Sequence, residues 1–123
     1  MSNFAVHFSS ARQDWATPWD LFRVLDDEYG PFDLDVCATP ENTKCAVFYT
    51  PKDDGLARPW TGRCWMNPPY GRDIGKWVKK AAEEARTNSE IVVCLLPART
   101  DTAWWHDFVE GLAAKVLFIR GAY

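Results

Sequence analysis

Four consecutive residues, Asn67-Pro68-Pro69-Tyr70, are the part of the sequence best suited to chemistry. The side-chain carbonyl of Asn67 and the backbone carbonyl of Pro68 are hydrogen-bond acceptors, and proline stiffens the backbone that holds them. The ring of Tyr70 offers a flat surface for stacking. Two fixed acceptors beside a ring are suited to bind an exocyclic amino group on a flat heteroaromatic base.

An amine of this kind is a poor nucleophile, because its lone pair is delocalised into the ring. Acceptors that take both N–H hydrogens favour a tetrahedral nitrogen and make the lone pair available, an effect of preorganised dipoles. A rigid turn loses little entropy in holding that geometry. The pattern therefore predicts group transfer to an aromatic amine without a strong general base. A plain tight turn after a strand is the alternative interpretation.

The elements that must position these residues follow from hydrophobic periodicity. We expect helices over 18–29, 73–86 and 101–114, and strands over 32–38, 46–50, 63–67, 91–98 and 115–119. Alternating strands and helices predict an α/β fold, with a mostly parallel sheet flanked by helices. Ligands of such sheets bind outside the carboxyl ends of the strands, where Asp35 and Asn67 are expected.

Local signals refine this outline. Thr17 is expected to cap the first helix, with Pro18 at the first helical position and Asp20 completing a capping box. Helix 73–86 should bury one apolar stripe and expose a charged face that includes Glu84. The predicted stripe consists of Ile74, Trp77, Val78, Ala81 and Ala85. The polar residues 1–14 are interpreted as an N-terminal arm, and 15–123 as a single domain.

Composition and charge limit the class of protein. The 123 residues, 47% of them hydrophobic, are enough for one domain with a real core. No apolar run is long enough for a transmembrane helix, and the N-terminus lacks the pattern of a signal peptide. The four cysteines contain no CxxC pair, so buried reduced thiols are expected and no metal; a zinc site with His7 or His106 is a remote alternative.

The net charge of −3 lacks the basic field typical of nucleic-acid binding, although basic residues can cluster; it would suit a cationic cofactor. The ordered segments "WATPWDLF", "FDLDVCATPEN", "FYTPKDDGLARPWTGRCWMNPPYGR", "VVCLLPARTDTAWWHDFV" and "VLFIRG" are more specific. Together they resemble the small phage and prophage DNA N6-adenine methyltransferases over roughly residues 9–121.

The resemblance implies a Rossmann-like fold of the class I methyltransferase type and S-adenosylmethionine as cofactor. It implies double-stranded DNA as partner, with the target adenine flipped out of the stack, and a cytoplasmic location in a bacterial host cell. Asn67, Pro68 and Tyr70 would hold the adenine, and Pro69 would shape the turn.

The same resemblance implies a set of cofactor residues. Asp35, together with Ala38, would border the methionine part, and Thr17 with Pro18 would lie beside the cofactor. Asp35 could instead only cap the helix expected to follow its strand. Asp54 would contact the adenosine, although Asp53 could serve instead.

The sequence departs from the family in two places. The glycine-rich loop usual after the first strand of methyltransferases is replaced by "DVCATPEN". The chain also ends at Tyr123, before the usual basic-aromatic segment and closing strand, which implies either C-terminal truncation or a sheet completed differently. The early end keeps an inactive DNA- or cofactor-binding remnant open as a function. Two other functions stay open as well: RNA adenine methylation, and glutamine-amide methylation, whose enzymes carry NPPY but usually also the glycine-rich loop. The oligomeric state is also open, and a dimer could supply DNA contacts.

Overall fold

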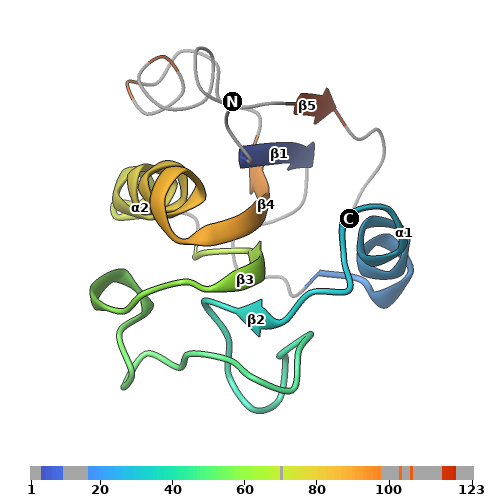
Figure 1. The fold of residues 1–123 in the computed structure, drawn as a ribbon, viewed down its shortest axis with the longest axis horizontal. Coiled ribbons are helices and arrows are strands. Elements are labelled where there is room, and N and C mark those ends of the chain that lie inside the picture. The colour runs from blue at the N-terminus through green and yellow to red at the C-terminus, as the bar shows by residue number, and fades with distance from the viewer. Residues whose placement is uncertain are drawn as a thin grey trace.

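The computed structural model describes residues 4–9, 17–69, 71–97, 103, 106 and 115–118. Within this part of the chain, five strands form one sheet in the order β2-β3-β4-β1-β5, and every neighbouring pair is parallel (Figure 1). The elements are β1 (Phe4–Ser9), α1 (Trp19–Tyr29), β2 (Leu34–Asp35), the 3-10 helix η1 (Gly55–Ala57), β3 (Gly62–Met66), α2 (Ile74–Thr87), β4 (Ser89–Pro97) and β5 (Lys115–Phe118). The Rossmann-like α/β prediction is confirmed.

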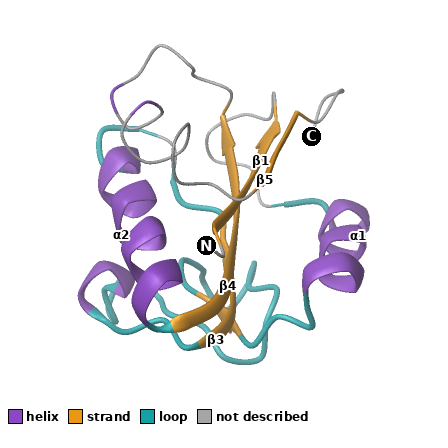
Figure 2. Ribbon diagram, turned by 45° about the horizontal axis from the view of Figure 1, so that its top comes forward, coloured by secondary structure: helices purple, strands orange, loops and turns teal. Residues whose placement is uncertain are grey.

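Helices α1 and α2 lie on opposite faces of the sheet (Figure 2). Successive side chains of a strand point to opposite faces, so β3 and β4 contribute to two separate cores. Trp65 of β3 packs toward α1, whereas its neighbours Cys64 and Met66 pack toward α2. Because both faces are covered, these strands are mostly apolar, as is typical of parallel sheets, and the polar residues Arg63, Ser89 and Glu90 lie where the strands begin. None of the described helices is long and apolar enough to cross a membrane.

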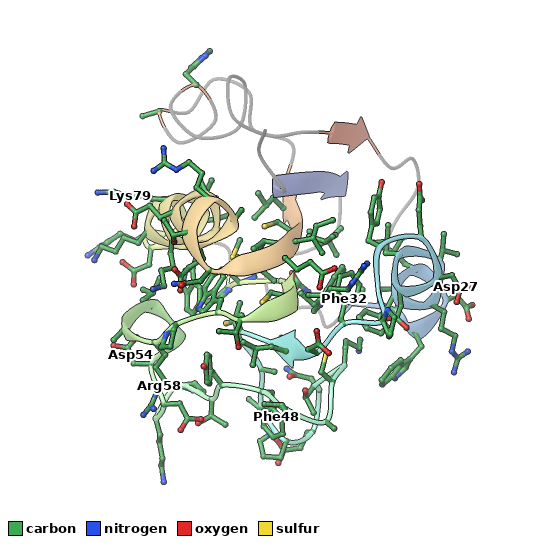
Figure 3. The ribbon with its side chains drawn as sticks, viewed as in Figure 1. Asp27, Phe32, Phe48, Asp54, Arg58 and Lys79 are labelled. Carbon is green, nitrogen blue, oxygen red and sulfur yellow. The ribbon has the colours of Figure 1, made fainter. Side chains whose placement is uncertain are left out.

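Aromatic contacts dock α1 against β3. The Phe22 ring meets the Trp65 ring edge-on at a centroid distance of 5.2 Å. Phe32 approaches Phe22 and Trp65 at 5.7 Å each and lies between α1 and the sheet (Figure 3). Buried aromatic pairs of this kind contribute about 0.5–1.5 kcal/mol beyond the area that they bury. Since Trp65 precedes Asn67 by two positions, this cluster fixes the start of α1 relative to the Asn67 corner.

Helix α2 buries the stripe that periodicity predicts, Ile74, Trp77, Val78, Ala81 and Ala85. Glu84 was expected on the exposed face and is instead buried. One carboxylate oxygen accepts a hydrogen bond of 2.7 Å from the backbone N–H of Trp60, and Lys80 lies 3.4 Å from that same oxygen. The prediction failed because this partner comes from a loop 24 positions earlier in the chain.

The expectation of an N-terminal arm is wrong for residues 4–9. They form β1, which lies between β4 and β5 and pairs with both in parallel register. The short apolar run "FAVHF" carries the signal for this strand, but the polar residues on either side of it favour a loop.

Three other predicted elements differ from the structure. Helix α1 begins at Trp19, with Pro18 at the cap position, and no side chain caps it. Predicted strand 46–50 is reduced to one parallel bridge between Phe48 and Asp35. Predicted strand 32–38 is reduced to β2. On the outer side of the sheet, β2 pairs only with the single bridge at Phe48. The predicted helix 101–114 lies outside the described residues, apart from 103 and 106.

Candidate active site at the carboxyl ends of β2 and β3

Strand register brings the two predicted parts of the site together. Asp35 of β2 pairs with Trp65 of β3, and the backbone N–H of Val36 donates to the Trp65 carbonyl at 3.1 Å. The strands are parallel, so the segments after Asp35 and after Met66 leave the sheet at the same edge. Asp35 to Ala38 and Asn67 to Pro69 therefore adjoin each other, where open α/β sheets bind ligands.

Asn67 is joined to Thr17 across 50 positions of the chain. The Asn67 side-chain nitrogen donates a hydrogen bond of 2.8 Å to the Thr17 hydroxyl oxygen. Thr17 is only 4% exposed, and Asn67 is half-buried. This contact replaces the expected helix cap, because the Thr17 hydroxyl engages the corner after β3 rather than the first turn of α1. The carbonyl oxygen of the Asn67 amide is on the side away from Thr17.

The two prolines differ in exposure. Pro68 is buried behind Asn67, whereas Pro69 is exposed. Proline fixes φ at both positions. Tyr70, the predicted stacking residue, lies outside the described residues.

Asp35 organises the loop that follows β2. One carboxylate oxygen accepts from the backbone N–H of Cys37 at 3.3 Å, and the other accepts from that of Lys44 at 3.0 Å. The side chain is 3% exposed. Burial raises the pKa of Asp35 to about 6, although the hydrogen bonds from Lys44 and Cys37 oppose the rise. The carboxylate thus closes a loop in which no glycine is present.

The same loop contacts the first turn of α1. The Lys44 ammonium lies 4.3 Å from the centroid of the Trp19 ring, within cation–π distance. Trp19 is an exposed aromatic residue, 49% accessible, two positions after Thr17. Burial lowers the pKa of Lys44, and the negative charge of Asp35 opposes that change. Lys44 thereby links the loop after β2 to the helix that carries Thr17.

A second loop closes on the end of β2. The backbone N–H of Ala38 donates to the Tyr49 carbonyl at 3.0 Å, and that of Tyr49 donates to the Asp35 carbonyl at 3.0 Å. Ala38 is buried, so its small side chain faces protein. The segment between Phe48 and η1 is held along the edge of β2 by these contacts.

Gly55 brings the next predicted site residue to this edge. A β-carbon added to Gly55 would lie 2.3 Å from the Val36 carbonyl oxygen and 3.2 Å from the Trp77 ring. The backbone of "DDGL" therefore passes directly against the end of β2. Asp54, immediately before it, is exposed and has a left-handed backbone with φ of 56° (Figure 3).

Asp53 and Asp54 have different roles in this turn. One oxygen of Asp53 accepts from the backbone N–H and the hydroxyl of Thr50, at 2.8 and 3.0 Å. These bonds hold the pKa of Asp53 below its ordinary value. The side chain of Asp53 is occupied within the turn, and the exposed carboxylate of Asp54 is oriented outward.

The cysteines near the site are all free thiols. Burial raises the pKa of Cys37 to about 12, and the nearby Asp35 carboxylate adds to the rise. Burial also raises the pKa of Cys64 to about 11. Such thiols stay protonated near neutral pH and are poor nucleophiles. Among the described residues, no group of three histidine, cysteine or acidic side chains is placed to hold a metal ion.

Sequence reasoning missed two residues that shape this site, Lys44 and Gly55. The glycine in "DDGL" carried a usable signal, because glycine often marks a close backbone approach. Lys44 carried none, since its partners, the Asp35 carboxylate and the Trp19 ring, are distant along the chain. The hydrogen-bond acceptors of Asn67 and Pro68 follow β3, and the loops after β2 lie beside them. This arrangement is suited to bind an amine next to a second ligand.

Known proteins resemble this chain in sequence. The sequence model of the family described as DNA N-6-adenine-methyltransferase (Dam) matches residues 6–122. A DNA N-6-adenine-methyltransferase of Escherichia phage T1 is 39% identical over 115 residues, which make up 90% of this chain and 46% of the phage protein. The DNA N-6-adenine-methyltransferase of Haemophilus phage HP1 (strain HP1c1) is 37% identical over 110 residues, 88% of this chain and 62% of its own.

A third relative, described as the putative methyltransferase YfdM of Escherichia coli (strain K12), is 38% identical over 63 residues, 46% of this chain and 69% of that protein. The chain spans about half of the phage T1 protein and somewhat more of the phage HP1 protein. No solved structure matches it. Because the family's sequence model matches nearly the whole chain, the protein belongs to the DNA N-6-adenine-methyltransferase (Dam) family.

Proposed function

We propose that the protein transfers a methyl group from S-adenosylmethionine to the N6 amino group of adenine in double-stranded DNA. The observation that carries this proposal is the position of Asn67 and Pro68 at the carboxyl end of β3, next to the Asp35 loop on the neighbouring strand. The names of the phage relatives support adenine in DNA as the substrate. Their phage origin supports the cytoplasm of a bacterial host cell as the place where the protein acts.

The chain's own groups would act on the amine. The Asn67 side-chain carbonyl and the Pro68 carbonyl would each accept one N–H of the adenine amino group. This interaction opposes delocalisation of the nitrogen lone pair into the ring and makes the nitrogen more nucleophilic. The amine's proton would pass to water, so no strong base is required. Tyr70 would stack on the flipped adenine, and Pro69 would keep the turn in shape.

The residues at the end of β2 fit the proposed cofactor. An exposed carboxylate, Asp54, can accept hydrogen bonds from ribose hydroxyls, and Gly55 lets its backbone approach Val36 closely. Asp35 holds the loop in which Ala38 would border the methionine part. When bound, S-adenosylmethionine supplies an electrophilic methyl group.

Thr17 and Pro18, at the start of α1, would lie beside the cofactor at the carboxyl ends of β2 and β3. The target nitrogen of adenine lies inside duplex DNA, so this site requires the base to leave the stack before its amino group can meet Asn67.

Incubation with S-adenosylmethionine radiolabelled on the methyl group and with unmethylated duplex DNA tests this function. We expect label in the DNA as N6-methyladenine, and a fall in rate of about 100-fold or more for Asn67→Ala, because one fixed acceptor is lost. Asn88→Ala, the same truncation at the end of α2, is the matched control and should keep the wild-type rate.

The other acceptor substrates are tested in parallel reactions with RNA and with protein. Label that enters RNA or a glutamine side chain, and not DNA, would overturn the proposed substrate. Cofactor binding without transfer to any of the three would identify a non-catalytic binding protein.

A further inference from the structure

The exposed carboxylate of Asp54 belongs to a turn whose backbone must be held in place before it can bind a ligand. Asp54 has a left-handed backbone, with φ of 56° and ψ of 80°. Such a conformation in a residue other than glycine persists only where the surrounding structure fixes it. On the N-terminal side, the backbone N–H of Asp54 donates to the Thr50 carbonyl at 3.2 Å. On the C-terminal side, the contacts of Gly55 fix the turn.

Trp60 binds the turn at Gly55. Its indole N–H donates a buried hydrogen bond of 2.8 Å to the Gly55 carbonyl oxygen. The direction of this bond is unambiguous, because an indole N–H only donates and a carbonyl oxygen only accepts. The same oxygen accepts a longer bond of 3.4 Å from the backbone N–H of Arg58, which closes the 3-10 turn within the loop itself. Trp60 therefore connects the Gly55 carbonyl to the core.

The core in turn holds Trp60 through both of its backbone groups. The backbone N–H donates to the Glu84 carboxylate of α2 at 2.7 Å, and the carbonyl accepts from the Ser89 hydroxyl, at the start of β4, at 2.7 Å. The side chain is fully buried, and its ring stacks on Trp77 of α2 at a centroid distance of 6.2 Å. Trp60 thus links α2 and β4 to the backbone next to Asp54.

We infer that Trp60 is a positioning residue for the cofactor, which acts through the Gly55 carbonyl to keep Asp54 where it would bind the ribose of S-adenosylmethionine. This inference rests on the proposed role of Asp54 in cofactor binding. A protein whose binding-competent arrangement is only partly populated binds its ligand more weakly by that fraction. Loss of the Trp60 hydrogen bond should therefore weaken cofactor binding and leave the chemical step at Asn67 unchanged.

Two replacements of Trp60 test this role. Trp60→Phe removes the indole N–H and part of the ring. Replacement of Trp60 by 3-benzothienylalanine keeps the two-ring shape, because sulfur takes the place of the N–H group. For both proteins we expect the calorimetric Kd and the KM for S-adenosylmethionine to rise roughly 10-fold, as for a competent population of about 10%. The kcat at saturating cofactor and the KM for DNA should stay at the wild-type values.

Two further variants separate positioning from general loss of stability. Val92→Ala truncates a fully buried residue of β4 in the same core, so it should lower the Tm and leave the Kd for S-adenosylmethionine unchanged. In an Asp54→Ala background, replacement of Trp60 should change the Kd little, because the carboxylate that it positions is absent. Circular dichroism of each variant confirms that the fold is retained.

The outcomes separate this inference from the proposed function. An unchanged Kd for the benzothienylalanine protein would overturn the inference alone, and so would an equal rise in Kd with and without Asp54→Ala. The inference would also fail if the replacements lowered kcat at a constant Kd. A wild-type protein that binds S-adenosylmethionine and methylates no DNA would overturn the proposed transfer, whereas the Kd comparison would still decide the role of Trp60.

Discussion

At the end of β2, the carboxylate of Asp35 binds backbone rather than facing solvent. Its two hydrogen bonds, from the N–H groups of Cys37 and Lys44, hold a turn that dinucleotide-binding folds shape with glycines. The sequence predicts Asp35 as a site residue, and both that role and a direct cofactor contact stay predictions. What the structure adds is that the carboxylate supports the loop from within.

Asp35 should make the free energy of unfolding decrease as the pH rises, which is the opposite of the usual effect of an acidic residue. Its pKa is raised to about 6, so between about pH 4 and pH 6 the folded protein keeps a proton that the unfolded chain has lost. The stabilisation from this carboxyl is complete below about pH 4 and is lost as the pH rises through about 6.

Asp35→Asn removes this titration. Urea denaturation should show that the free energy of unfolding of the wild type, minus that of Asp35→Asn, decreases from about pH 4 to about pH 7. Asp20→Asn, at an exposed position on α1, controls for the loss of one carboxylate. A difference that stays constant or increases with pH would contradict the assignment.

At the scale of elements, the approach of η1 to β2 depends on Gly55. The backbone there is not left-handed, so the demand for glycine is steric alone. Gly55→Ala would place a β-carbon against the Val36 carbonyl and the Trp77 ring. We expect a loss of about 1–3 kcal/mol in the free energy of unfolding, as for other overpacked sites, and a higher Kd for S-adenosylmethionine because Asp54 is displaced.

Gly71→Ala is the matched control, because nothing lies within 4 Å of its added β-carbon. Its free energy of unfolding should stay within about 0.5 kcal/mol of the wild type. Equal stability of the Gly55→Ala protein would show that η1 can move away from β2 at no cost.

The elements that could be predicted from sequence are those with strong local patterns. Helix α2 has a complete apolar stripe, and β4 is a continuous apolar run from Ile91 onward, so both were expected within a few residues of their observed bounds. The short β2 and the bridge at Phe48 could not be delimited, because their extent depends on pairing with each other. The same limit hid the bond between Thr17 and Asn67, whose partners meet only after α1 docks on β3.

At the scale of the whole molecule, β1 is an interior strand of the sheet. It pairs with β4 on one side and with β5 on the other. Deletion of residues 1–9 should therefore disrupt the sheet, because both neighbours lose their backbone partners. We expect loss of cooperative thermal unfolding and aggregation on expression.

The same deletion would be harmless if these residues were a polar arm. A truncated protein that keeps the wild-type Tm and circular dichroism spectrum would contradict the place of β1 in the sheet. The wild-type chain, expressed under the same conditions, is the reference for both measurements.

The position of β1 also bears on how the protein is made. Residues 4–9 are synthesised well before the strands on either side of them, which begin at Ser89 and Lys115. Pairings so distant along the chain must overcome a large loop-closure entropy, and they slow folding. The interior of the sheet is therefore completed only after β5 has been synthesised, and until then β1 lacks one of its two partner strands.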